Sequence, residues 1–160
     1  MLYVIALGSN RRHSRFGGPA AIIEEALRRL PGMLLLRSRT IASRPLGPSE
    51  RTYANAAAVI ESNMMPQAML AVLQAIERDL GRVRSGQKWR ARTMDLDIVL
   101  WSDGVWASPA LTIPHREFRA RHFVLDPLAE IVPNWRDPVT GQTVKHLRAR
   151  HIKARPQSRP

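Results

Sequence analysis

Asp95 and Asp97 begin an apolar run, DLDIVLW at 95–101. Their type and spacing suggest a chemical function more directly than any other pattern in the sequence. Side chains alternate along a strand, so both carboxylates are predicted to face one side, with their Cα atoms about 7 Å apart. The residues predicted to face the other side are Leu96, Ile98 and Leu100. Two ionised carboxylates this close repel each other and lose hydration unless a cation lies between them. Magnesium meets that need, because it binds one or two carboxylates and completes its shell with substrate phosphates and water.

The loop before this run is basic and contains no acid. Its cations, within eleven residues, are Arg82, Arg84, Lys88, Arg90 and Arg92. Arginine grips phosphoryl oxygens with two N–H groups, so such cations beside two aspartates predict a polyphosphate site. Trp89 is a large apolar surface that suits either a binding role or packing onto the domain. The alternatives are a solvated basic loop and aspartates that only pair with Arg90 or Arg92 at an exposed strand edge.

The common phosphate-binding motifs are missing from the sequence. Neither G-x-x-x-x-G-K-S/T nor G-x-G-x-x-G occurs, and L-G-S-N at 7–10 replaces neither of them. A nucleotide would therefore be held by arginines and metal rather than by a glycine-rich loop. His115 begins a second basic segment with Arg116, Arg119 and Arg121, and its spacing alone leaves it either structural or a phosphate contact.

The elements that must position these residues follow the order βαββαβ. They are a strand at 2–7, a helix at 19–30, an extended stretch at 33–42, a strand at 55–62, a helix at 66–80 and a strand at 95–101. Proline near each helix start and glycine after each helix end mark the boundaries. SDG before VWA predicts a hairpin. This order predicts an α+β, ferredoxin-like fold with an antiparallel sheet, an added hairpin and C-terminal helical segments, which by itself fixes no function.

The composition limits the class of protein. The chain has 160 residues, 44% of them apolar, and no cysteine. These values predict one hydrophobic core and exclude disulfides, cysteine–zinc sites and thiol catalysis. The N-terminal run MLYVIALGSN has no basic leader and is far shorter than the roughly 20 apolar residues of a membrane span, so we expect a cytoplasmic protein.

The charge is strongly basic and unevenly placed. A net charge of +12, from 25 Lys and Arg against 13 Asp and Glu, suggests an anionic partner. Residues 145–160 hold six basic residues and no acid, few apolar residues and a proline-containing end. We therefore expect a domain at 1–144 and a basic, partly disordered tail at 145–160. Unspecific contact of this tail with nucleic acid is the alternative.

Seven short pieces of sequence occur in order from the first strand to about Pro133. They are IALGSN (5–10), SRPLGP (43–48), YANAA (53–57), GRVR (81–84), KWRARTMDLDI (88–98), LTIPH (111–115) and RHFVLDPLAEI (121–131). Together they resemble the 6-hydroxymethyl-7,8-dihydropterin pyrophosphokinase family of folate biosynthesis. One piece would be unspecific, but seven in the same order are specific.

The resemblance implies an enzyme that moves the β,γ-pyrophosphoryl group of ATP onto the pterin hydroxymethyl oxygen and releases AMP, with two magnesium ions. It implies that Asp95 and Asp97 bind the metal and that Arg82 and Arg92 act catalytically from mobile loops. The positions that match contacts to ATP are Gln74, Glu77, Arg84, Lys88, Ile98, Thr112, His115, Arg116 and Arg121. The positions that match the pterin side are Ser43, Arg44, Leu46, Tyr53, Asn55, Trp89 and Phe123. Tyr53 and Phe123 match the pair that stacks on the ring, and Trp89 matches a residue that seals the pocket.

The chain departs from the family pattern at several positions. Lys88 stands where arginine is usual, and Arg90-Ala91 replaces a small residue and proline, which predicts a less rigid loop. Arg44 stands where proline is frequent, and Arg116 replaces an aromatic residue. None of these changes removes a metal ligand or a stacking residue, so they bear on affinity and loop motion more than on the reaction.

A basic ferredoxin-like domain that binds nucleic acid is the rival function, since such domains bind RNA. RNA-binding domains of this kind carry glycine and alternating aromatic residues on central strands, and no such stretch occurs in the sequence. A non-catalytic relative is a third possibility, against which the intact aspartates argue. We expect a monomer whose partners are ATP and the reduced pterin, with no specific nucleic acid and no membrane.

Overall fold

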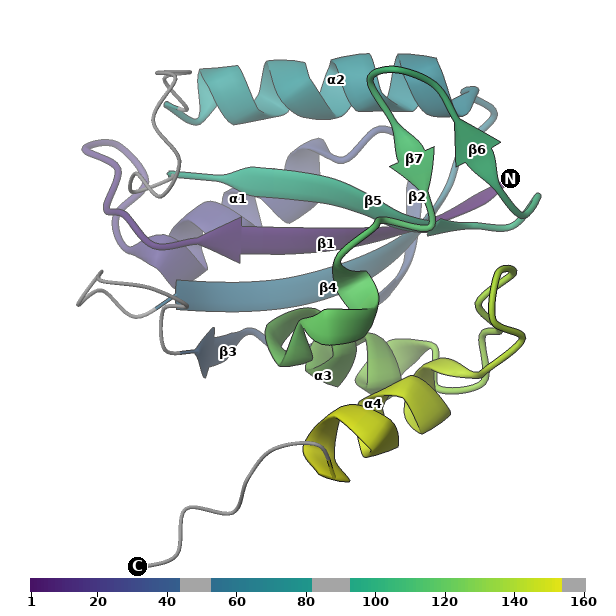
Figure 1. Cartoon of the computed structure of the whole chain (residues 1–160). Helices are drawn as coiled ribbons and strands as arrows, with labels where there is room; N and C mark the ends of the chain where they lie inside the picture. Colours follow the sequence, from purple (N-terminus) through teal and green to yellow (C-terminus); the bar gives the residue numbers. More distant parts are fainter. Residues whose placement is uncertain (44–52, 82–92, 154–160) are drawn as a thin grey trace, which may run out of the picture.

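An antiparallel sheet organises the described part of the chain, residues 1–43, 53–81 and 93–153 of a computed structural model. Four strands lie in the order β2-β4-β1-β5, and β3 also pairs with β4 (Figure 1). The strand bounds are β1 Leu2–Ser9, β2 Met33–Arg37, β3 Ile41–Ser43, β4 Tyr53–Glu61 and β5 Asp95–Trp101. The predicted α+β class with an antiparallel sheet is confirmed, although the extended stretch at 33–42 forms two short strands instead of one.

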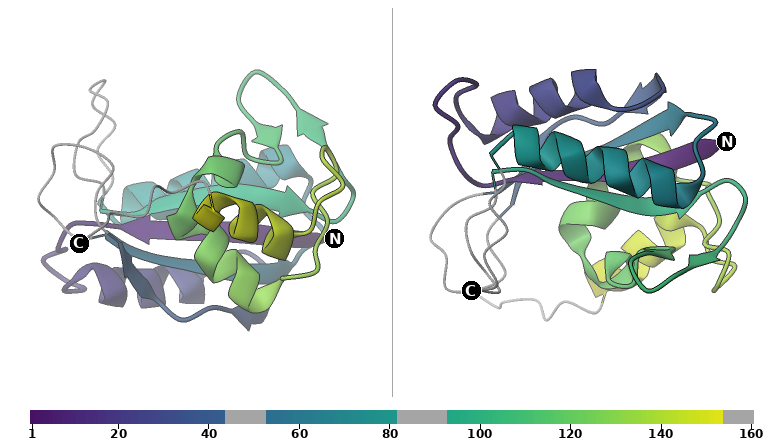
Figure 2. Two further views of the ribbon diagram at one scale, coloured as in Figure 1. Left: turned by 60° about the horizontal axis from the view of Figure 1, so that its bottom comes forward. Right: turned by 90° about the horizontal axis from the view of Figure 1, so that it is seen from above.

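Helices cover both faces of this sheet. Helices α1 (Pro19–Arg29) and α2 (Pro66–Asp79) pack on one face, and α3 (His122–Ile131) and α4 (Val144–Lys153) lie on the other (Figures 1 and 2). A 3-10 turn, η1 (Phe118–Ala120), leads into α3. Helix α2 ends at the glycine predicted to stop it, because Gly81 takes φ +85°, a left-handed conformation that L-residues with side chains rarely adopt.

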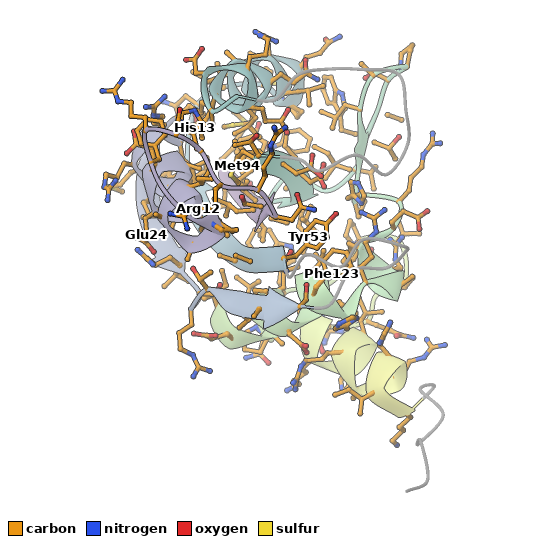
Figure 3. All side chains as sticks on the ribbon, turned by 90° about the vertical axis from the view of Figure 1, so that its left-hand side faces the viewer. Arg12, His13, Glu24, Tyr53, Met94 and Phe123 are labelled. Atoms are coloured by element: carbon orange, nitrogen blue, oxygen red, sulfur yellow. The ribbon has the colours of Figure 1, made fainter. Side chains whose placement is uncertain are left out.

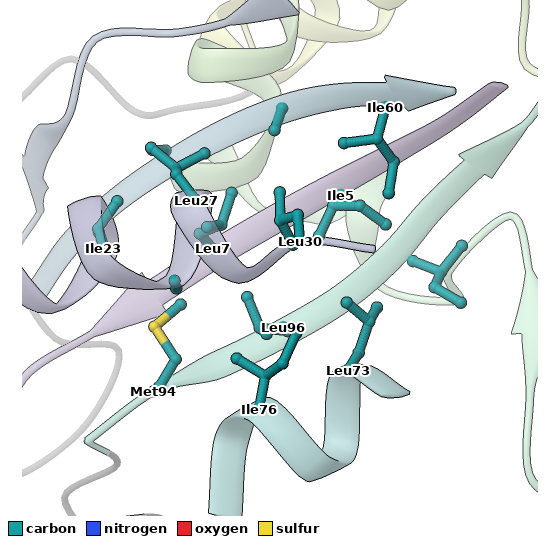
Figure 4. Packing of buried hydrophobic residues seen from close by; sticks show 14 of the residues in the cluster. Ile5, Leu7, Ile23, Leu27, Leu30, Ile60, Leu73, Ile76, Met94 and Leu96 are labelled. Carbon is teal, nitrogen blue, oxygen red and sulfur yellow. The ribbon is translucent and has the colours of Figure 1, made fainter. Parts of the chain in front are cut away.

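Two apolar cores result from the alternation of side chains along the strands. Leu7 of β1 and Leu96 of β5 meet Leu27 of α1 and Leu73 of α2 in the first core, as Figure 4 shows. Val4 of β1, whose neighbours Tyr3 and Ile5 lie in the first core, points into the second core under α3 and α4. Each fully buried aliphatic side chain contributes about 1.5–3 kcal/mol, so the strands are fixed from both faces.

A β-bulge in β5 changes one predicted side-chain direction. Ile5 pairs with Ile98 and Val4 pairs with Leu100, so Val99 is an extra residue on β5. The prediction that Leu100 faces the same side as Ile98 is therefore wrong, because Leu100 packs with Val99 in the second core. A bulge reverses the alternation beyond it, and no local pattern in the sequence shows where it falls.

The predicted hairpin after β5 is only partly correct. A tight turn does form at Gly104, whose N–H donates to the Trp101 carbonyl at 3.2 Å. The next strand, however, is β6 (Trp106–Ala107), and it pairs with β7 (Thr112–Ile113) in a separate two-stranded sheet rather than with β5. This small hairpin leads the chain back towards β5 at His115.

The C-terminal segment corrects the expectation of a disordered tail from residue 145. Residues 144–153 form helix α4, with Val144 and Leu147 buried in the second core. Arg148 Nε donates to Asp126 Oδ1 of α3 at 2.6 Å, which adds a polar tie. The expectation is thus wrong for 145–153, while 154–160 lie outside the described residues. None of the helices in the described ranges has the length and apolarity needed to cross a membrane.

Candidate active site

The sheet face that carries the second core turns polar at one end. Gly8 of β1 pairs with Asn55 of β4 on one side and with Asp95 of β5 on the other. Side chains in one such row point to the same face, so Asn55 and Asp95 flank a residue without a side chain. A Cβ at Gly8 would lie 3.5 Å from Asn55 Oδ1, which is ordinary contact. Among the described residues, Gly8 therefore leaves space between the side chains of Asn55 and Asp95, and we call this part of the sheet face the floor of the site.

A cavity of about 500 Å³ adjoins this floor, a volume typical of small-molecule sites. It lies between α2, β5 and the segment at 109–117. Of the residues predicted to contact ATP or metal, those lining it are Gln74, Glu77, Asp95, Asp97, Ile98, Thr112, His115, Arg116 and Arg121. Side chains from separate parts of the sequence are thus brought together around one space.

His115 is held beside Asp97 by the bulge in β5. Its backbone N–H donates to the Val99 carbonyl at 3.0 Å, and its Nδ1 accepts the Glu117 N–H at 3.2 Å. In a neutral ring the hydrogen is then on Nε2. This Nε2 lies 4.0 Å from Asp97 Oδ2, and both side chains stay partly exposed, at 28% and 37%. A carboxylate and an imidazole N–H therefore face the same solvent-accessible space.

Glu77 secures the outer edge of β5 at the cavity. Its Oε1 accepts the Leu96 N–H at 2.8 Å, and the side chain is buried. Because β5 is the last strand of the sheet, the Leu96 N–H points away from β1. Ile98, two residues further along, presents its backbone to the same edge. Ile98 also lines the cavity.

The turn between His115 and Arg121 is tied down by a buried ion pair. Arg119 Nε and Nη2 donate to Asp137 Oδ2 and Oδ1, both at 2.7 Å, and Asp137 is fully buried. Burial raises the pKa of this carboxyl group, but hydrogen bonds from Arg119, Thr140 and Val139 outweigh it and leave the pKa lowered. The pair stays ionised and fixes η1 at the rim of the cavity.

The described residues predicted for the pterin side lie outside the cavity lining, on neighbouring elements: Ser43, Tyr53, Asn55 and Phe123. Asn55 Nδ2 donates to Ser43 Oγ at 2.7 Å, and Ser43 pairs with Tyr53 across β3 and β4. Figure 3 shows Tyr53 at the start of β4 and Phe123 on α3 at the same end of the molecule, and α3 packs against β4. The Arg121 Cζ lies 5.9 Å from the centre of the Phe123 ring, which links this group to the cavity.

Seven predicted site residues lie outside the described part of the chain: Arg44, Leu46, Arg82, Arg84, Lys88, Trp89 and Arg92. The two ends that flank 82–92 are described, and Thr93 Oγ1 donates to the Gly81 carbonyl at 3.3 Å. Gly81 and Thr93, the described residues on either side of this segment, therefore lie next to each other.

The donor set suits magnesium better than a metal held wholly by protein. Within residues 1–43, 53–81 and 93–153, no three side chains of the His, Asp or Glu type gather around a common point. Zinc sites need three or four protein ligands, whereas magnesium is satisfied by one or two carboxylates with phosphates and water. Asp95 and Asp97, on one open face, fit the second case.

Comparison with known proteins identifies the family. Residues 4–133 match the model of the 7,8-dihydro-6-hydroxymethylpterin-pyrophosphokinase (HPPK) family. The chain belongs to the HPPK family. It is 39% identical over 145 residues to a 2-amino-4-hydroxy-6-hydroxymethyldihydropteridine pyrophosphokinase of Synechocystis, covering 90% of this chain and 73% of the relative. The enzyme of the same name from Pseudomonas aeruginosa is 41% identical over 136 residues, covering 84% and 82%.

Solved HPPK-DHPS structures share the fold. A crystal structure of HPPK-DHPS in complex with substrates superposes with a TM-score of 0.74 at 13% identity, covering 96% of this chain and 44% of that one. Plasmodium falciparum HPPK-DHPS with pteroate gives a TM-score of 0.71 at 14% identity, covering 95% and 42%. The chain thus spans less than half of these proteins, and the likeness concerns the fold alone.

Sequence reasoning missed two contributors to this HPPK site. The first is Gly8, although a glycine inside a strand is itself a signal of close approach by a ligand or backbone. Glu117 also lines the cavity, on the same side as His115 and Arg116. Nothing in the local sequence distinguishes it from an ordinary surface acid.

Proposed function

We propose that this HPPK family member transfers the β,γ-pyrophosphoryl group of ATP to the hydroxymethyl oxygen of 6-hydroxymethyl-7,8-dihydropterin and releases AMP. The observation that carries the proposal is the placement of Asp95 and Asp97 on an open polar floor beside a cavity rimmed by His115, Arg116 and Arg121. Carboxylates for a metal and cations for phosphates are the two charge types that this reaction needs.

The metal belongs to the proposal as well. Asp95 and Asp97 would hold magnesium, two ions by family resemblance, and the bound metal would neutralise charge on the phosphates being transferred. The protein's own task is to hold these carboxylates still, which β5 does through its pairing with β1 and the contact from Glu77.

Phosphate oxygens would be bound by the side chains at the rim of the cavity. Arg116 and Arg121 supply fixed positive charge, and His115 supplies an N–H beside Asp97. Further cations are proposed from the segment outside the described residues: Arg82, Arg84, Lys88 and Arg92. We assign Arg82 and Arg92 to the charge that develops during transfer, since a positioned arginine acts most strongly there.

The nucleotide base would lie deeper, against the outer edge of β5. Backbone groups of Ile98 and the side chains of Gln74 and Thr112 can read the edge of a flat heterocycle, while Leu70 and Leu111 offer apolar contact. Glu77 keeps this edge in place. ATP would thus extend from the base at Ile98 to the phosphates at the two aspartates.

The reduced pterin would occupy the floor at Gly8. Asn55 and Ser43 are buried there and joined by a hydrogen bond, which presets polar groups for one edge of the ring. Tyr53 and Phe123 are proposed to stack on the ring faces, as aromatic side chains do with flat heterocycles. Arg44, Leu46 and Trp89 are proposed to complete this pocket from outside the described residues.

An assay of AMP release tests the proposed reaction. The purified chain is mixed with ATP, magnesium and 6-hydroxymethyl-7,8-dihydropterin, and AMP and the pterin diphosphate are quantified. We expect the two products in equal amounts and none when the pterin or the metal is left out. Release of ADP, or AMP formation independent of the pterin, would contradict the proposal.

The rival function, a nucleic-acid-binding domain, is not supported by the family or by the named relatives. A monomeric state and a location in the cytoplasm remain predictions. Light scattering of the purified protein decides the first, and fractionation of cells decides the second.

A further inference from the structure

The turn η1 separates residues that line the cavity from residues that face the C-terminal segment. Arg116 and Glu117 line the cavity before the turn, and Arg121 lines it directly afterwards. The three residues of the turn itself, 118–120, do not line it. The position of Arg121 therefore depends on what holds this turn from behind.

Each residue of the turn has its own anchor. Phe118 is fully buried in the second core. Arg119 is paired with buried Asp137, as described above. Ala120 offers its backbone carbonyl to His151 Nε2 at 2.8 Å. Two of these three anchors, Asp137 and His151, lie beyond residue 133, where the match to the HPPK family ends.

His151 is well placed to act as a fixed donor. A carbonyl oxygen only accepts, so Nε2 carries the hydrogen in this contact. The other ring nitrogen, Nδ1, is buried and has no hydrogen-bond partner among the described residues. The His122 ring lies 5.9 Å away, centre to centre, and packs beside the His151 ring. The His151 ring thus donates from Nε2 to the Ala120 carbonyl and packs against the His122 ring.

Helix α4 is anchored to the rest of the domain, so His151 can hold the Ala120 carbonyl in place. Val144 and Leu147 are buried, and Arg148 pairs with Asp126 of α3 at 2.6 Å. On the other side of the contact, the Arg121 carbonyl accepts the N–H groups of Val124 and Leu125 at 3.0 and 2.9 Å. The first turn of α3 therefore starts directly behind the carbonyl that His151 binds.

We propose that His151 is a positioning residue for the pyrophosphoryl-transfer site, acting through the Ala120 carbonyl to set Arg121 at the cavity. This inference rests on the proposed function of Arg121 as a contact to the ATP phosphates. It assigns a role in the site to helix α4, which lies outside the region matched by the family. His151 itself is not among the residues that line the cavity.

Steady-state kinetics of His151 variants test the proposal. His151→Ala removes the donor, His151→Phe fills the space without a donor, and His151→Gln keeps an N–H near the position of Nε2. We expect the first two to raise KM for ATP about three- to tenfold, as the loss of one neutral hydrogen bond allows. The kcat and the KM for the pterin should change little, and His151→Gln should recover most of the loss. Ile152→Ala, which alters an exposed neighbour on α4, is the matched control.

A double-mutant cycle with Arg121→Ala shows whether the effect passes through Arg121. In that background, replacing His151 should have almost no further effect on KM for ATP, since coupled residues are not additive. Additive effects, or a His151→Phe variant with wild-type KM, would overturn the proposal.

Hydrogen exchange tests the positioning role of His151 without relying on the proposed contact between Arg121 and ATP. If Arg121→Ala itself left KM unchanged, the phosphate role would fail, but the positioning role would still predict faster exchange of the Val124 and Leu125 amides in His151→Phe. The Ile152→Ala control should exchange at the wild-type rate. Unchanged exchange at both amides in His151→Phe would overturn the positioning role itself.

Discussion

Gly8 is the single residue that opens the floor of the site. It stands between Asn55 and Asp95 near the end of β1, at a position paired on both sides, where glycine normally weakens a sheet. Its neighbours on the same face of β1, Ala6 and Val4, become larger and less polar towards the second core. Glycine at position 8 therefore lowers the stability of β1 slightly and leaves space for a ligand.

Replacing Gly8 with valine should weaken pterin binding without much effect on the free energy of unfolding. Valine suits a strand, and the first added carbon meets Asn55 Oδ1 only at 3.5 Å, so the free energy of unfolding should stay within about 1 kcal/mol of wild type. The side chain would occupy the floor between Asn55 and Asp95, so KM for the pterin should rise tenfold or more. Gly8→Ala should show a smaller rise. Unchanged kinetics in Gly8→Val would place the pterin elsewhere.

At the scale of elements, the ion pair between Arg119 and Asp137 makes stability depend on pH. The pKa of Asp137 is lowered in the folded state. Its stabilisation is therefore fully present above the ordinary aspartate value, about 4, and is lost as pH falls through the lowered folded value. The pair joins η1 to the 137–141 loop and so supports the rim of the cavity.

Asp137→Asn should cost about 3 kcal/mol of unfolding free energy at pH 7, because it breaks a buried ion pair. The difference from wild type should shrink as the pH is lowered below 4, since the wild-type carboxyl group then loses its charge too. Asp126→Asn is the control, because its partner Arg148 is 45% exposed and such pairs contribute under about 1 kcal/mol. Denaturant unfolding across a pH series measures both, and a gap that does not change with pH would contradict the assignment.

Helix α4 gives a second prediction at this scale. Leu147 is 6% exposed and packs in the second core, so Leu147→Ala should lower the unfolding free energy by about 2–4 kcal/mol. Ile152→Ala, at a side chain 53% exposed on the same helix, should have almost no effect. Equal and small effects of both substitutions would mean that 145–153 behave as a tail after all.

Some of these elements can be predicted from the sequence and others cannot, for physical reasons. Strands and helices with a period of 2 or 3.6 and a proline or glycine boundary, such as β1 and α2, are local patterns and were predicted within a few residues. The bulge at Val99 depends on pairing with β1, so Leu100 was assigned to the wrong face. Helix α4 buries few apolar residues among many cations, which made it look like a solvated tail.

At the scale of the whole molecule, the site lies where the helices of the described residues cover only part of one sheet face. Helices α3 and α4 pack over Val4 and Val59, and the row of Asn55, Gly8 and Asp95 lies further along the same face. Family resemblance supplied Gln74, Glu77, Ile98 and Thr112 of the cavity lining, while residue chemistry alone supplied the aspartate pair and the two basic segments. The anchors behind η1 join positions 18 and 31 residues apart, and such contacts become visible only in the folded chain.

Asp97→Asn measures most directly whether the aspartate pair supports metal-assisted transfer. The substitution keeps the volume and removes one charged ligand, so the protein should fold normally and be at least as stable as wild type without magnesium. AMP release with saturating ATP, pterin and magnesium should fall about a thousandfold, because several kcal/mol of transition-state stabilisation are lost. Asp103→Asn removes the same charge in the exposed turn after β5 and should leave turnover unchanged. Normal turnover of Asp97→Asn at ordinary magnesium concentrations would show that the carboxylates are structural and would contradict the proposed metal site.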